Sequence, residues 1–175
     1  SIMTSYLEKS SRYIIYICGF LLFLCAFFTG VEVILRKFFL ISLGGVDEIS
    51  SYVLGICISW SIAYVLFEKM HIRIDILYHK LTKKIQYLFD LLAMVSTFIF
   101  ISIIAYFSFD VFLSSFEKNS LANTPLGTPL WIPQLLWTSG FIFFLIVISI
   151  LIYKCLQNIF TKNKNDVAII KKDIL

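Results

Sequence analysis

The residues of this 175-residue chain that could do chemistry stand at the ends of long apolar runs. Two carboxylates open one such run, and a His-Arg-Asp string follows its other end. The ionisable residues concerned are Glu32, Arg36, Asp47, Glu48, His71, Arg73 and Asp75. Such groups can transfer protons, hold ions or pair with the charges of a partner, and a charge inside or beside an apolar span is a functional hypothesis by default.

Other kinds of active chemistry find little support in the sequence. The two histidines, His71 and His79, lie outside the apolar runs, so neither could hold a haem iron between spanning helices. The sequence contains no Cys-x-x-Cys pair, no cluster of metal ligands, no phosphate-binding glycine loop and no nucleophile with its base. We expect the four cysteines to be small packing residues. The sequence therefore predicts no enzyme, no cofactor and no metal site.

The composition places the chain in a membrane. It is 59% hydrophobic and 15% charged, whereas soluble domains are about 25% charged. A chain this short cannot bury so much apolar surface inside itself, so the excess must face lipid.

Four apolar segments are long enough to cross a bilayer, which needs about 20 helical residues. We therefore predict an all-α integral membrane protein, with one four-helix domain over residues 1–175. The third segment would extend about 48 Å as a helix, so we expect it to tilt or to project from the membrane. The expected spans are residues 13–35, 49–67, 85–116 and 131–156.

The distribution of Lys and Arg predicts the orientation. Twelve of them lie before the first span, between the second and third, or from Lys154 at the end of the fourth span onward, and three lie in the other two connections. The positive-inside rule then places both termini and a basic tail at 157–175 in the cytoplasm. This topology accounts for the basic charge without a nucleic-acid partner, and the basic segments should attract anionic lipid.

The outer ends of the spans allow two interpretations each. Glu32 and Arg36 are spaced for an ion pair within one helix, or one of them meets a charge on a partner subunit. Asp47 could cap the second helix, where the helix dipole favours carboxylates, and Glu48 is the better candidate for a contact with a neighbour.

The connections carry two further patterns. Residues 71–81 alternate as a strand would, but an isolated strand at a membrane surface lacks a partner for its edge. An amphipathic interfacial helix and a solvated loop both remain open there. Pro129 discourages helix before it, and Pro133 falls in the first turn of the fourth span, where proline is tolerated.

Taken in order, these features resemble the small membrane subunit of tripartite ATP-independent periplasmic (TRAP) transporters, the dicarboxylate Q type. The resemblance covers most of the chain, and its most specific part is the His-Ile-Arg-Ile-Asp string at 71–75. Arg36 after the first span, Glu48 before the second, and the Thr-Pro and Ile-Pro pairs at Pro129 and Pro133 support it. Many members have an aromatic residue and two Glu where this chain has Val46-Asp47-Glu48.

The resemblance implies a multi-pass subunit of the bacterial inner membrane that braces a large elevator-type permease subunit. A periplasmic substrate-binding protein would deliver an organic acid anion, such as a C4-dicarboxylate or sialic acid, and sodium would drive its import. The candidate contact residues are Glu32, Arg36, Glu48, His71, Arg73, Asp75, Pro129 and Pro133.

Two alternatives belong to other classes. Small multidrug-resistance transporters also have four spans and use a glutamate in the first, but Glu32 lies too close to one end of its span for a midplane proton site. The chain could also anchor another membrane complex, although the absence of intramembrane histidine argues against a respiratory one.

Overall fold

The structure, a computed structural model, describes residues 2–69 and 82–173, with the side chains of 2–4, 67–69, 83, 84, 87 and 158–173 left out of the description. The described chain contains four long helices, each apolar enough to cross a membrane, and no named strand. The helices are α1 (Ile2–Phe39), α2 (Val46–Lys69), α4 (Lys83–Glu117) and α5 (Trp131–Asp173). The predicted all-α membrane fold is therefore confirmed.

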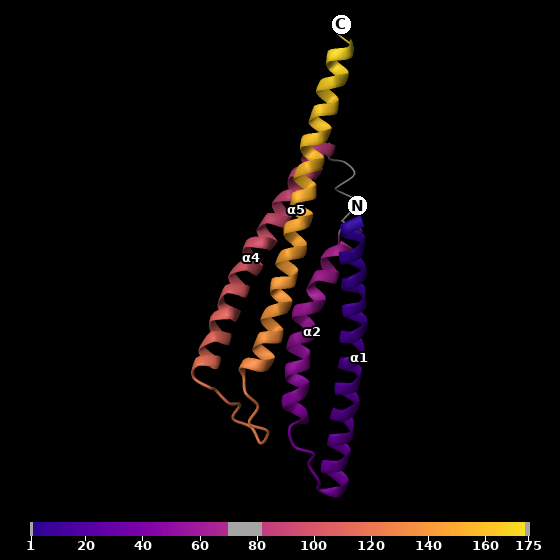
Figure 1. Ribbon diagram of the computed structural model, residues 1–175. Coiled ribbons are helices and arrows are strands. Elements are labelled where there is room, and N and C mark those ends of the chain that lie inside the picture. The colour runs from indigo at the N-terminus through magenta and orange to yellow at the C-terminus, as the bar shows by residue number, and fades with distance from the viewer. Residues whose placement is uncertain (1, 70–81, 174–175) are drawn as a thin grey trace.

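Each helix contains one expected span and extends beyond it. α5 continues as helix through residues 157–173, where the sequence analysis placed a basic tail, and this end projects past the other helices (Figure 1). At about 1.5 Å per residue, α1, α4 and α5 each exceed 50 Å, against about 30 Å for the hydrocarbon core. A helix in lipid satisfies its own backbone hydrogen bonds, so a continuous apolar sequence stays helical to its end.

The helices lie side by side in an open row in the order α1, α2, α5, α4 (Figure 1). α1 packs on α2, α2 on α5, and α5 on α4. The core lies where α5 meets α2 and α4, around Phe144, Val147 and Ile148. α1, at one edge of the row, has one neighbour and is the least buried of the four spans. The row leaves most aromatic and aliphatic side chains of its outer surface exposed.

Small residues set the spacing between neighbouring helices. A Cβ placed on Gly140 of α5 would lie 2.9 Å from the main-chain carbon of Ser59 on α2, so only glycine allows this approach. Beside it, the Trp60 indole N–H donates to the Leu136 carbonyl at 3.0 Å, and the Trp60 ring stacks on Phe143 with 5.3 Å between centroids. These contacts tie α2 to α5 near the middle of the row.

Candidate functional site

The Glu32 carboxylate organises the corner between α1 and α2. It lies one turn before Arg36, whose Nη2 donates to Glu32 Oε1 at 2.6 Å. The Ser42 hydroxyl donates to Glu32 Oε1 at 2.8 Å, and the Leu43 N–H donates to Oε2 at 3.2 Å. The predicted pair within one helix is therefore present, and the same carboxylate also fixes the loop that follows the helix.

Burial separates the two members of this pair. The Glu32 side chain is 3% exposed and the Arg36 side chain is 59% exposed. A buried carboxylate requires hydrogen-bond donors, and the three donors above supply them. Arg36 is thus the member that presents its charge to the surroundings of the chain.

The corner between α1 and α2 presents apolar side chains. Leu40 adopts a φ of 52°, a left-handed conformation that is unfavourable for leucine, and the residue is 90% exposed. Phe38, Phe39 and Ile41 beside it are also exposed. The Glu32 hydrogen bonds to Ser42 and Leu43 hold the chain in this conformation.

Glu48 joins α2 to the connection between α4 and α5. Its carboxylate lies in the first turn of α2 and accepts the Tyr52 hydroxyl at 2.6 Å and the Thr124 hydroxyl from the distant connection. Asp47, also in this turn, is exposed and lies inside the helix, because α2 begins at Val46. The Asp47 carboxylate therefore interacts favourably with the helix dipole, as expected, but Asp47 does not occupy the N-cap position.

Gly45 brings the same two connections into contact. Its φ is +84°, and a Cβ on it would lie 2.2 Å from Leu126 Cδ1 and 2.5 Å from Leu126 Cγ. Gly45 is therefore required both for its backbone conformation and for the space that Leu126 fills.

The connection between α4 and α5 has its own hydrogen bonds. Leu121 and Pro129 form an antiparallel bridge, flanked by the bond from Ala122 N–H to the Thr128 carbonyl at 2.9 Å. The Gly127 N–H donates to the Thr124 carbonyl at 3.0 Å, which closes a tight turn. Pro129 thus lies outside helix, as predicted, and Pro133 lies in the first turn of α5, as predicted.

Some of the predicted contact residues lie close together in the structure, and others do not. Glu32 and Arg36 form one cluster at the α1–α2 corner, while Glu48 forms another with Thr124. His71, Arg73 and Asp75, with the proposed interfacial segment at 71–81, lie outside the described residues. Sequence reasoning missed Thr124 and Trp60. A tryptophan in mid-span was the available signal for the second, because its N–H needs an acceptor in lipid.

The described residues contain no group of three or more His, Cys, Asp or Glu that could hold a metal ion. The four cysteines are free; Cys18 and Cys57 are buried against each other, with the Cys57 thiol donating to the Cys18 carbonyl at 3.7 Å. The central parts of the four spans carry no Asp, Glu, Lys, Arg or His. The arrangement is suited to holding helices and connections in place, with its fixed charges at the helix ends.

A family model that describes the DctQ component of tripartite ATP-independent periplasmic transporters matches residues 24–158. No curated protein and no solved structure matches the chain. The matched range contains α2, α4 and the connections α1–α2 and α4–α5, together with the Glu32 and Glu48 clusters.

Proposed function

The chain belongs to the DctQ family of TRAP transporter components, and we propose that it is the scaffold that holds the large elevator-type permease subunit of such a transporter in the membrane. In this proposal a periplasmic substrate-binding protein delivers an organic acid anion to the large subunit. The sodium gradient then drives import. The chain itself contributes a multi-pass membrane surface and carries no substrate.

The observation that carries this proposal is the open row of helices. A self-contained transporter encloses its binding site between helices, whereas here the main contacts between the described helices join neighbours in the row, α1 with α2, α2 with α5 and α5 with α4. The central parts of the spans also carry no charged residue that could bind an anion or sodium. A scaffold needs broad apolar faces and fixed charges at the helix ends, and the chain offers both.

We further propose that both termini lie in the cytoplasm and that the membrane is the bacterial inner membrane. The twelve-to-three distribution of Lys and Arg supports this orientation. It places the Glu32 and Glu48 clusters at the periplasmic face, where the binding protein arrives. Arg36 is the proposed direct contact there, while Glu32 and Glu48 shape the two connections and Pro129 and Pro133 set the course of the second. His71, Arg73 and Asp75 are proposed contacts on the cytoplasmic side.

The test is co-expression of the tagged chain with the adjacent large permease, purification in mild detergent, and uptake in proteoliposomes. We expect a one-to-one complex and uptake of a labelled C4-dicarboxylate or sialic acid only with the binding protein and a sodium gradient. Arg36→Ala should lower recovery of the complex, while Lys37→Ala, a charge removal at the next residue, should not. A stable homodimer that ignores the large subunit would contradict the proposal and favour the small-transporter alternative.

A further inference from the structure

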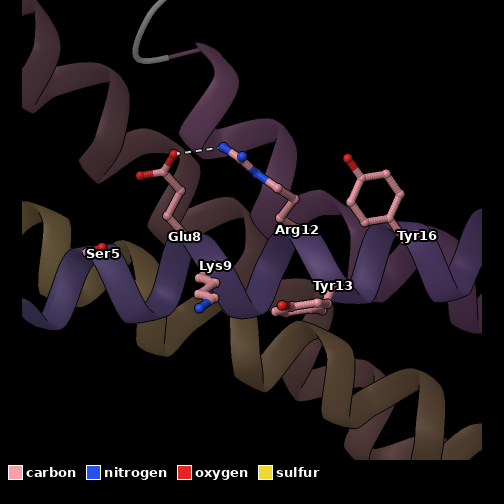
Figure 2. Close-up of a pocket in the computed structure, with 6 residues that line it drawn as sticks. All are labelled: Ser5, Glu8, Lys9, Arg12, Tyr13 and Tyr16. Atoms are coloured by element: carbon pink, nitrogen blue, oxygen red, sulfur yellow. Dashed lines mark hydrogen bonds and ion pairs between the residues drawn. The ribbon is translucent and has the colours of Figure 1, made fainter.

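An open hollow of about 410 Å³ lies along the first part of α1, at the end opposite the α1–α2 corner (Figure 2). Six side chains of the helix line it. They are Ser5, Glu8, Lys9, Arg12, Tyr13 and Tyr16. A hollow of this size can hold a small polar group, since ligand sites commonly measure about 300–1,000 Å³.

The lining residues form two adjacent rows on one side of the helix. Residues four apart lie one above the other on a helix surface. One row therefore runs from Glu8 through Arg12 to Tyr16, and the other from Ser5 through Lys9 to Tyr13 (Figure 2). In each row a cation is followed, one turn further along the helix, by a tyrosine.

The face with these rows points away from the rest of the described chain. Leu7 and Ser11 lie on the other side of α1, where Leu7 packs against the core and Ser11 is completely buried. Tyr13 and Tyr16, by contrast, are 60% and 68% exposed. The two rows are therefore open to the surroundings of the protein.

The cations of the hollow have unused hydrogen-bonding capacity. Arg12 Nη2 donates to Glu8 Oε1 at 3.3 Å, which orients a guanidinium that has five N–H donors. No described residue pairs with the Lys9 ammonium. Arginine and lysine beside hydroxyl groups are the usual ligands of phosphate.

The next turn of the helix distinguishes a lipid from a soluble phosphate. Both rows continue into apolar side chains, Phe20 after Tyr16 and Ile17 after Tyr13, and both are exposed. The surface thus changes from cations to phenols to hydrocarbon within three turns. The same order, phosphate, interface and acyl chain, is found along a membrane phospholipid, and tyrosine is typical of that interface.

We propose that this face of α1 binds one phospholipid, with its phosphate held by Arg12 and Lys9 and its acyl chains lying along Ile17 and Phe20. Tyr13 and Tyr16 donate to the phosphate and ester oxygens between these levels. The site fixes the depth of the edge helix, which has only one neighbour in the row. This inference is independent of the proposed function, because it uses only α1 and the bilayer.

The test is lipid titration of the purified full-length chain, with retained lipid counted by native mass spectrometry. The probes are phosphatidylglycerol, diacylglycerol with the same chains and no phosphate, and glycerol 3-phosphate without chains. The double variant Lys9→Gln/Arg12→Gln should weaken phosphatidylglycerol binding about tenfold or more, since each Lys or Arg near an anionic lipid adds to the free energy of binding. Lys37→Gln/Lys118→Gln removes the same charge at the other end of the helices and should leave binding unchanged.

Tyr13→Phe/Tyr16→Phe removes only two hydroxyl groups, so it tests the site in a chain of nearly unchanged shape. It should weaken phosphatidylglycerol binding by a smaller factor, about threefold. Equal retention of phosphatidylglycerol by the wild type and both lining variants would overturn the proposal. An affinity for diacylglycerol equal to that for phosphatidylglycerol would also overturn it, because apolar contact alone would then suffice. An equal affinity for glycerol 3-phosphate would overturn it as well, because it would indicate a soluble ligand.

Discussion

Glu32 shows how one carboxylate near the end of a span stabilises a corner. Glu32→Gln keeps the size of the side chain but removes the charge that Arg36, Ser42 and the Leu43 N–H share. We expect the melting temperature in detergent without added lipid to fall by several degrees. Hydrogen bonds to a charged group are stronger than those to a neutral group, and weakening them costs more stability when the groups are buried than when they are exposed.

Glu8→Gln is the matched control on the same helix. Glu8 also pairs with an arginine four residues later, but at 3.3 Å and with both side chains about half exposed. Exposed ion pairs of this spacing contribute little to stability, so the melting temperature of Glu8→Gln should stay within about one degree of wild type. Equal melting temperatures for both variants would show that burial of Glu32 does not strengthen its interactions.

Gly45 and Gly44 separate backbone strain from packing. Both have positive φ, but a Cβ would contact Leu126 at position 45 and nothing within 4 Å at position 44. Gly44→Ala should lower the free energy of unfolding by about 1–2 kcal/mol through strain alone. Gly45→Ala should cost about 1 kcal/mol more, because it also pushes the two connections apart.

A double variant completes this experiment. Leu126→Ala removes the side chain that clashes in the Gly45→Ala chain. The extra loss in free energy of unfolding that Gly45→Ala causes in wild type should therefore disappear when Gly45→Ala is made in a Leu126→Ala chain. The measurement is unfolding in mixed micelles followed by circular dichroism. Additive losses from the two substitutions would show that Gly45 and Leu126 are not energetically coupled.

Between helices, a close approach of α2 and α5 depends on Gly140. Gly140→Ala places a methyl group 2.9 Å from the Ser59 backbone, which cannot turn aside as a side chain could. We expect it to separate α2 from α5 and to lower the free energy of unfolding by about 1–3 kcal/mol. Gly55→Ala, on α2 with open space around it, should be neutral or stabilising by up to about 1 kcal/mol.

The indole of Trp60 reports on this separation. Its fluorescence should change in Gly140→Ala, since the hydrogen bond to Leu136 and the stack on Phe143 span the same interface. Gly55→Ala should leave the spectrum unchanged. An unchanged spectrum and unchanged stability in Gly140→Ala would show that the helices are not held at this distance.

The number of helices and the positions of the connections α1–α2 and α4–α5 could be predicted from the sequence, while the full lengths of α1 and α5 were not. Apolar length, Gly44-Gly45 and the prolines mark these places through local chemistry. The order of the helices in the row could not, because helices that are apolar on every side give no periodicity that identifies a contact face. The bond from Thr124 to Glu48 joins residues 76 positions apart, and a local pattern contains no information about such a pair.

For the whole molecule, the contacts between helices imply that their apolar spans are offset. Ser59 lies level with Gly140, Cys57 with Cys18, and Ser50 with Thr29. Counting residues from the first and second contacts places the midpoint of the α1 span about 15 Å from that of the α5 span along the helix direction, and counting from the first and third places it about 9 Å away. An upright row would therefore leave part of one of the two spans in water.

Tilting the row in its own plane removes this offset. α1 and α5 are separated by α2, so they are about 18 Å apart at usual packing distances. A tilt of about 25–40° brings both midpoints to the same depth, against about 20° for an average spanning helix. Burial of two apolar spans outweighs the small cost of tilting, so we expect the tilted arrangement in a bilayer.

Spin labels at exposed positions can measure this tilt. Phe23→Cys on α1 and Ile142→Cys on α5, each in a chain without its native cysteines, lie about 8–13 Å apart along the helix direction. In a tilted row their depths in the bilayer should agree within a few Å, whereas an upright row would keep the full difference. Equal depths would also explain how helices longer than the bilayer is thick fit within it. At a tilt of about 25–40°, a path through about 30 Å of hydrocarbon takes about 22–26 helical residues. The upper end of that range is close to the 27-residue apolar part of α5. A depth difference of about 8–13 Å would instead mean that the bilayer deforms around an upright row.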